Sequence, residues 1–170
     1  MVESLDDCVG RIMDKLEAMG IADNTVIILT GDNGGDRDQT TAGLKGYKGF
    51  SHEGGVREPL IVKWPGNAEP GSTCDVPVIG TDFYPTMLEM AGLPLKPEEH
   101  MDGRSIVSLL KGKDCLGRDN LYWHYPHYHR TMPYGAVRSG NMKLIEFFED
   151  GALELYDLES DPNETANLAT

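Results

Sequence analysis

The chain has 170 residues, of which 39% are hydrophobic and 25% are charged, and 28 acidic against 15 basic residues give a formal net charge of −13. This composition is typical of a globular protein with a sizeable core. The acidic balance argues against a nucleic-acid-binding protein, and no apolar stretch approaches the roughly 20 residues of a transmembrane helix. Cys8, Cys74 and Cys115 are scattered along the chain, so they predict neither a disulfide framework nor a zinc site.

The beginning of the chain predicts a layered α/β structure. Apolar residues recur every three or four positions over residues 2–19, which predicts a helix with one apolar face, ending at Gly20. Residues 25–30 are β-branched and almost wholly apolar, as in a strand that is covered on both faces. A helix followed by a buried strand favours an α/β sheet with helices packed against it.

The middle of the chain alternates a long loop with regular elements. Residues 31–58 are rich in glycine and show little periodicity, which is typical of a functional loop. The elements predicted after it are a strand over 59–65, a helix over 83–92 and a short helix over 105–112.

From residue 119 onwards the pattern predicts short antiparallel strands. The segment LYWHYPHYH (121–129) is rich in aromatic residues and histidine. Short strands are predicted over 134–140, 141–148 and 152–158, and the last two form a hairpin. We therefore place a boundary near residue 115, with residues 116–170 forming a small antiparallel β subdomain that ends in a short tail helix.

The stretch IILTGDNGG (27–35) raises the first functional question, because a buried strand ends at a carboxylate and an amide. Ligands collect at the carboxyl ends of strands in open α/β sheets. Asp32 and Asn33 offer hard oxygen ligands that suit calcium or magnesium, and Gly34 and Gly35 let the backbone bend beneath an ion. Asp-Asn-Gly-Gly is equally good turn sequence, so this stretch alone leaves both interpretations open.

The second stretch is LKGYKGFSHEGGVREP (44–59), in which Lys45 and Lys48 stand between glycines. A lysine here would present a point charge to an oxyanion, although a solvated loop lysine has the same pattern. Glu53, Arg57 and Glu58 are predicted to form a structural ion pair that braces the loop.

Together, in this order, the two stretches resemble the sulfatases of the alkaline-phosphatase superfamily, in particular the arylsulfatase-like enzymes. The resemblance rests on a helix, a strand ending in DNGG, a glycine-flanked lysine, EGGVREP and a strand ending in WPG. TDFYPTMLEMAG and LELYDLESDPNE are similar to later parts of the same enzymes. The resemblance implies that residues 1–115 are the C-terminal part of an α/β catalytic domain and that the sheet is alkaline-phosphatase-like.

The resemblance also implies roles for individual residues. Asp32 and Asn33 are expected to be two ligands of an active-site calcium ion. Lys48 matches the catalytic lysine that contacts the sulfate and stabilises the leaving group. Lys45 falls where the family often has arginine and receives no role, and Arg57 is expected to be structural.

The sequence departs from the family in its nucleophile. Sulfatases use a formylglycine made from the Cys or Ser of a C/S-x-P-x-R motif, but none of the cysteines has proline two places on. Ser160 has the proline, but Glu164 replaces the arginine. We therefore expect this chain to be the C-terminal fragment of a sulfuric ester hydrolase. It would be inactive alone, would ligate calcium only in part and would pair with a missing N-terminal half.

The histidines of WHYPHYH form a separate candidate site. We assign His124 and His127 as contacts to a sulfated carbohydrate or aryl sulfate substrate, because aromatic and histidine side chains suit sugar binding. Packing within the small sheet is the competing interpretation, and a zinc site is a third.

Three readings of function remain open from the sequence. A sulfatase is favoured. One alternative is a phosphodiesterase or phosphonate hydrolase of the same superfamily. The other is a non-catalytic carbohydrate-binding or interaction domain that is prone to self-association. The N-terminus MVESLDDCVG is not a signal peptide, and a periplasmic or secreted location is suggested only by the resemblance.

Overall fold

The structure, a computed structural model, describes residues 2–37 and 41–169. The chain forms two compact units: Met1–Leu29 with Ile61–Leu116, and Thr30–Leu60 with Gly117–Thr170. The chain passes from the first unit to the second for the last time between Leu116 and Gly117, and the boundary predicted from the sequence was near residue 115. The glycine-rich segment, however, groups with the C-terminal sheet. In the described part of the chain, no helix is long and apolar enough to cross a membrane.

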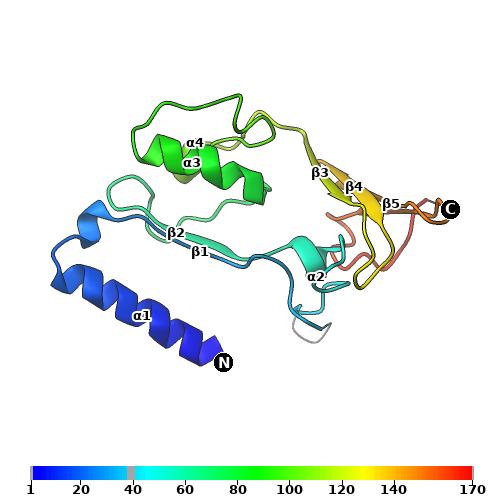
Figure 1. The fold of residues 1–170 in the computed structure, drawn as a ribbon, viewed down its shortest axis with the longest axis horizontal. Helices are drawn as coiled ribbons and strands as arrows, with labels where there is room; N and C mark the ends of the chain where they lie inside the picture. The colour runs from blue at the N-terminus through cyan, green and yellow to red at the C-terminus, as the bar shows by residue number, and fades with distance from the viewer. Residues whose placement is uncertain (1, 38–40, 170) are drawn as a thin grey trace. The chain divides into compact units, whose positions relative to one another are not determined.

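The first unit contains the predicted helices (Figure 1), and its two short strands pair with each other into a sheet. Its core lies at the start of α4, where Ile106 and Val107 are buried. Thr86 supports this core, because its hydroxyl donates to the Asp82 carbonyl (2.6 Å) and accepts from the Ile106 N–H (3.0 Å). The elements with predominantly first-unit residues are α1 (Val2–Ala18), η1 (Ala22–Asn24), β1 (Ile27–Thr30), β2 (Leu60–Lys63), η3 (Gly80–Asp82), α3 (Phe83–Met90) and α4 (Val107–Leu110).

The apolar face of α1 is open. No described residue of this helix is buried, and the side chains of Leu5 and Ile12 are 57% and 59% exposed. Residues 27–29 of β1 are only half-buried. The predicted helix and strand are both present. The described residues do not, however, bury the strand on both faces as expected.

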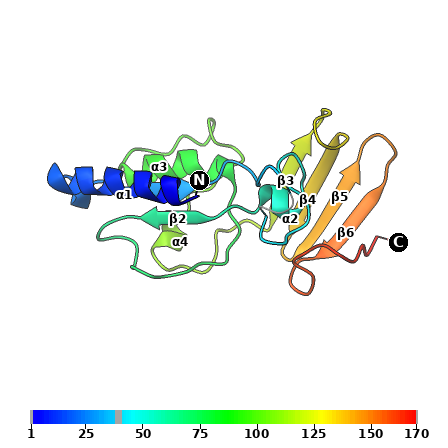
Figure 2. The ribbon, with the colours of Figure 1, turned by 90° about the horizontal axis from the view of Figure 1, so that it is seen from below.

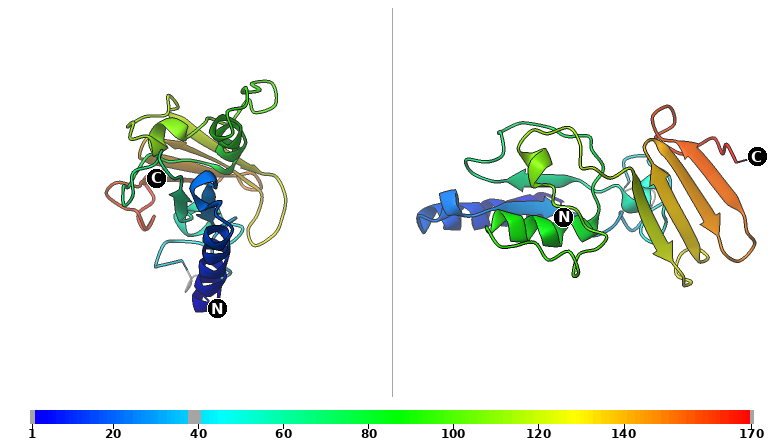
Figure 3. Two further views of the ribbon diagram at one scale, coloured as in Figure 1. Left: turned by 90° about the vertical axis from the view of Figure 1, so that its left-hand side faces the viewer. Right: turned by 90° about the horizontal axis from the view of Figure 1, so that it is seen from above.

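The second unit is a four-stranded antiparallel sheet in the order β3-β4-β5-β6, together with a short helix (Figures 2 and 3). β5 and β6 form the predicted hairpin, with Met142 opposite Asp157. Residues 158–169 contain turns instead of the expected tail helix, because the Asp161 carboxylate accepts the N–H groups of Thr165 and Ala166. The elements are α2 (Glu53–Val56), β3 (Asn120–Tyr125), β4 (Tyr134–Ser139), β5 (Met142–Phe147) and β6 (Leu153–Asp157).

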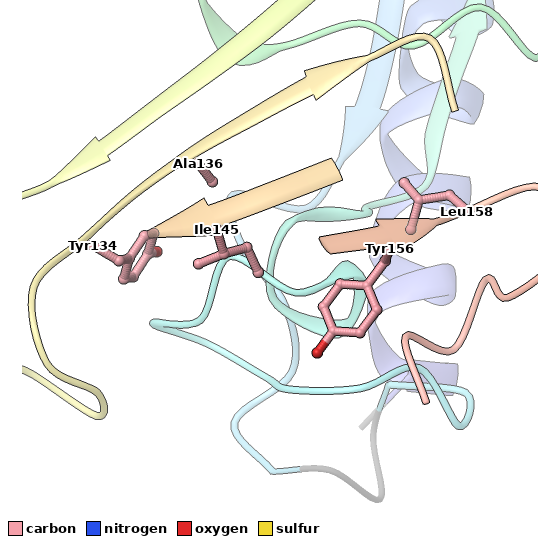
Figure 4. Packing of buried hydrophobic residues seen from close by; sticks show 5 residues of the cluster. All are labelled: Tyr134, Ala136, Ile145, Tyr156 and Leu158. Atoms are coloured by element: carbon pink, nitrogen blue, oxygen red, sulfur yellow. The ribbon is translucent and has the colours of Figure 1, made fainter. Parts of the chain in front are cut away.

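One face of the sheet carries the core of the second unit (Figure 4). Its apolar members are Tyr134, Ala136, Ile145, Tyr156 and Leu158. Because side chains alternate between the faces of a strand, Lys143 of β5 lies on the same face as Ile145 and is also buried. Charged and apolar side chains thus share this face, and Lys143 contacts Glu53 of the glycine-rich segment.

Candidate functional site

The two glycine-rich stretches meet through their backbones. The Gly34 N–H donates to the Gly55 carbonyl oxygen (3.0 Å), and the Lys48 N–H donates to the Gly35 carbonyl oxygen (2.9 Å). A Cβ atom added at Gly34 would lie 2.7 Å from Gly55 Cα, which is closer than real side chains allow. Glycine is therefore required where the DNGG and EGG backbones pass each other.

These contacts bring three of the predicted site residues into one region of the second unit. Asp32 and Asn33 directly precede Gly34, and Lys48 is bonded through its N–H to Gly35. The Asp32 and Lys48 side chains are exposed and Asn33 is half-buried. We call Asp32, Asn33 and Lys48 the half-site. It can present two oxygen ligands and one ammonium group to a cation and an oxyanion.

A further carboxylate lies beside the half-site. Glu58 lies against the backbone of Gly31. Burial, together with the negative charge of Asp32, raises the pKa of Glu58 above its usual value. The carboxyl groups of Asp32 and Glu58 therefore lie close enough at the end of β1 to interact, and both offer the oxygen donors that a hard cation uses.

The donor chemistry fits a hard cation, but the number of donors does not complete a calcium site. Calcium takes about 6–8 oxygen ligands. Among residues 2–37 and 41–169, no group of three or more His, Cys, Asp or Glu side chains is arranged to hold a metal ion. Asp32 and Asn33 are thus suited to be part of a coordination shell only.

A buried lysine holds the EGG turn in place. Lys143 Nζ lies 3.0 Å from Glu53 Oε1 and 3.0 Å from Glu164 Oε1, and the Lys143 and Glu164 side chains have no exposure. The Glu53 N–H also donates to Glu164 Oε2 (2.6 Å). A buried ammonium group is stable only when it is paired. The three side chains therefore fix α2 against β5 and against the tail.

The ion-pair cluster also accounts for an unusual backbone conformation. Glu164 has a φ of 54°, in the left-handed region that residues other than glycine rarely adopt. Its carboxylate forms an ion pair with Lys143 and accepts a hydrogen bond from the Glu53 N–H. Arg57, the residue predicted to be structural, lies 3.8 Å from Glu53 and belongs to the same cluster.

A second polar cluster connects the lysine-bearing turn with β6. Lys45 Nζ donates to the Tyr156 hydroxyl (2.6 Å), and the Tyr156 hydroxyl donates to Glu154 (2.7 Å). His52 Nε2 lies 2.7 Å from the same Glu154 carboxylate. Lys45 is therefore engaged with the sheet. The Lys48 side chain is exposed, and its ammonium group has no hydrogen bond or ion pair to the described residues.

Burial controls the titration of this second cluster. It lowers the pKa of His52 below 6.5, although the hydrogen bond to Glu154 opposes the shift. Burial alone would raise the pKa of Glu154, but hydrogen bonds from Tyr156 and His52 lower it. The neutral imidazole is consequently the form that the folded chain favours.

The two predicted histidines of WHYPHYH have aromatic neighbours. The ring centroid of His124 lies 5.6 Å from that of Phe148, and the ring centroid of His127 lies 4.0 Å from that of Tyr125. Both histidines are exposed. Their assignment as substrate contacts stays a prediction.

Sequence reasoning predicted Glu53 as a bracing residue but missed its two partners, Lys143 and Glu164. Lys143 was detectable, because it occupies a core-facing position in the alternation of β5, between Met142 and Leu144. Glu164 gave no such signal, since it lies in an acidic tail and its contacts come from residues far away in the sequence. The short helix α2 was also missed, because its two glycines disfavour helix.

The fold and the paired DNGG and EGG loops define a protein of the sulfatase type, within the alkaline-phosphatase superfamily. Residues 46–170 match the family described as N-sulphoglucosamine sulphohydrolase, C-terminal, and the chain belongs to that family.

Individual relatives agree with this family assignment. The chain is 41% identical to a sulfatase from Formosa agariphila over 98% of its length, and 32% identical to human arylsulfatase A over 96%. It spans 34% and 37% of these two proteins, about a third of their length.

Solved structures share the fold. BT4656, solved in complex with its substrate D-glucosamine-2-N,6-O-disulfate, superposes with a TM-score of 0.84 at 32% identity, over 98% of this chain and 34% of that one. The phosphonate monoester hydrolase from Silicibacter pomeroyi has a TM-score of 0.76 at 25% identity, over 96% of this chain and 34% of that one.

Replacing the buried lysine should destabilise the second unit. In Lys143→Met, the carboxylates of Glu53 and Glu164 lose their buried partner, and we expect the free energy of unfolding to fall by about 3–5 kcal/mol. Urea unfolding measures this loss. Lys63→Met, which changes an exposed lysine of β2, should cost no more than about 0.5 kcal/mol. Equal effects of the two changes would contradict the role of Lys143.

The buried His52 should make stability depend on pH. Its pKa is lowered in the folded chain, so the unfolded chain takes up the proton first. The stability contributed by the neutral ring is complete above pH 6.5 and declines as the pH falls from 6.5 toward the folded pKa. Between pH 7.5 and 5.5, wild type should therefore lose more unfolding free energy than His52→Phe. Equal losses in the two proteins would show that His52 does not titrate in this way.

Proposed function

We propose that this chain is the C-terminal portion of a sulfuric ester hydrolase and carries half of its calcium and sulfate site. The observation that supports the proposal best is the pair of backbone hydrogen bonds from Gly34 and Lys48. They unite an oxygen-ligand pair and a lysine from two separate stretches of sequence.

Lys48 is the catalytic residue of the half-site. Its exposed ammonium group would contact a sulfate oxygen and offset the negative charge that develops as the ester bond breaks. Asp32 and Asn33 would hold the calcium ion, which supplies additional positive charge to the sulfate oxygens when it is bound. Lys45 holds the turn through Tyr156 and Glu154 and takes no part in the chemistry.

The remaining ligands and the formylglycine nucleophile would come from an N-terminal part of the same protein. Two features support this division: the chain spans about a third of its relatives, and the apolar face of α1 is open. Self-association through this face is the corresponding expectation for the chain by itself. The 170 residues alone would not hydrolyse sulfate esters.

The substrate class that we propose is a sulfated carbohydrate or an aryl sulfate. The carbohydrate is supported by the similarity to BT4656, whose complex contains a glucosamine disulfate. His124 and His127, with Tyr125 beside them, are proposed to contact the part of the substrate that carries the sulfate.

Hydrolysis of a phosphonate monoester is the second candidate function. The similarity to the Silicibacter pomeroyi hydrolase favours it, and a lysine beside a cation would stabilise a phosphonate oxygen as well as a sulfate oxygen. The sequence relatives named above are sulfatases, which is why the sulfate ester is our first choice.

Loss of the Lys48 ammonium group should slow turnover of a sulfate ester. In the longer protein that contains this chain, Lys48→Ala should lower kcat by about 10²–10³-fold, the usual effect of removing one electrostatic donor from a transition state. Steady-state kinetics with an aryl sulfate measures the effect. The control is Lys63→Ala, an exposed lysine outside the second unit. Unchanged turnover in Lys48→Ala would remove this residue from the mechanism.

The half-site should bind calcium weakly. Two side-chain ligands leave most of a shell of about 6–8 oxygens to water, so micromolar calcium should leave the melting temperature of the 170-residue chain unchanged. Any increase in the melting temperature that millimolar calcium causes in the wild-type chain should be absent in Asp32→Ala. A large increase at micromolar calcium would contradict the division of the site between two parts of the protein.

A further inference from the structure

The loop between β3 and β4, residues 126–133, is attached to both stretches of the half-site. Arg130 forms an ion pair with the Asp36 carboxylate (2.5 Å) and donates to the Asp36 carbonyl oxygen (2.7 Å). Its guanidinium carbon also lies 5.5 Å from the ring centroid of Tyr47. One side chain thus contacts the continuation of the DNGG stretch and the residue before Lys48.

Gly49 leaves room for the residue before Arg130. A Cβ atom added at Gly49 would lie 2.9 Å from His129 Nδ1 and 3.4 Å from Arg130 Cβ. Gly49 also has a φ of 96°, which a residue with a side chain rarely adopts. The imidazole of His129 therefore lies against the backbone of the residue that follows Lys48.

The His129 ring is available for a ligand. It is exposed, and within the described part of the chain it has no hydrogen bond or ion pair. His124 and His127 are exposed as well, and their rings lie near those of Phe148 and Tyr125. Of the three histidines in WHYPHYH, His129 is the one whose contacts lie beside Lys48.

We propose that His129 is a specificity-determining residue that hydrogen-bonds a hydroxyl group of a sulfated sugar whose sulfate is bound at Lys48. The inference rests on the proposed function and makes it more specific. An imidazole can donate to and accept from a hydroxyl group. Arg130 is the corresponding positioning residue, because its contacts with Asp36 and Tyr47 hold the loop at the half-site.

The proposal predicts that two kinds of sulfate ester respond differently to the loss of His129. A sulfated sugar offers hydroxyl groups to His129, whereas 4-nitrophenyl sulfate offers none. Loss of the imidazole should therefore weaken the binding of the sulfated sugar and leave the binding of the aryl ester unaffected. Because the hydrogen bond would form in both the ground state and the transition state, the effect should lie mainly in KM.

The test compares two substrates in the longer protein that contains this chain. In His129→Ala, we expect kcat/KM for D-glucosamine-2-N,6-O-disulfate to fall about 10-fold, mainly through KM, and kcat/KM for 4-nitrophenyl sulfate to change less than about 2-fold. His129→Asn, which keeps hydrogen-bonding capacity, should lose less. His100→Ala, in the first unit, is the matched control and should change neither value.

Variants of Arg130 test the positioning role separately. Arg130→Met should reduce the same sugar preference, and Arg130→Lys, which keeps the charge opposite Asp36, should restore part of it. Equal effects of His129→Ala on both esters, or on neither, would overturn the inference while leaving the sulfatase proposal intact. If wild type cleaved neither ester, the proposed function would fail, and this inference would fail with it.

Discussion

The candidate site depends on one buried ammonium group. Lys143 has no exposure and pairs with Glu53 and Glu164, so the start of α2 is fixed to the sheet and to the tail. The glycines of α2 then pass so close to the DNGG stretch that only glycine fits at Gly34. The ion pairs of Lys143 on β5 thus fix the segment against which the DNGG stretch packs.

Burial of these charged groups costs free energy, but it also fixes the orientation of α2. Two carboxylates and an ammonium group lose water when they are buried, so such a cluster is weak evidence for stability. Its geometry is directional, however, and apolar contacts alone would not fix the rotation of α2. The separate hydrogen bonds of Lys45 and His52 with β6 hold the same stretch a second time. Lys48 can then remain exposed on a backbone that is held on both sides.

The sequence predicted the regular elements well, because period-2 and period-3.6 patterns are local. The antiparallel sheet, the β5–β6 hairpin and the helix α3 all follow from such patterns. The motifs also led to the expectation that Asp32, Asn33 and Lys48 belong to one site, but not to the backbone contact of DNGG with EGG. The contacts that make this pairing a site were not predictable, since Glu53 and Lys143 lie far apart in the chain and no local pattern connects them. His129 belongs to the candidate cluster WHYPHYH, but its place beside Gly49 was not predictable, because only the fold brings the two residues together.

Comparison of a sulfate ester and a phosphonate ester with the same leaving group in one enzyme tests the central claim most directly. The longer protein that contains this chain should be assayed with 4-nitrophenyl sulfate and with a 4-nitrophenyl phosphonate monoester at the same calcium concentration. A half-site of Asp32, Asn33 and Lys48 that serves a sulfatase predicts a higher kcat/KM for the sulfate ester. Faster hydrolysis of the phosphonate ester, or no hydrolysis of the sulfate ester, would contradict it.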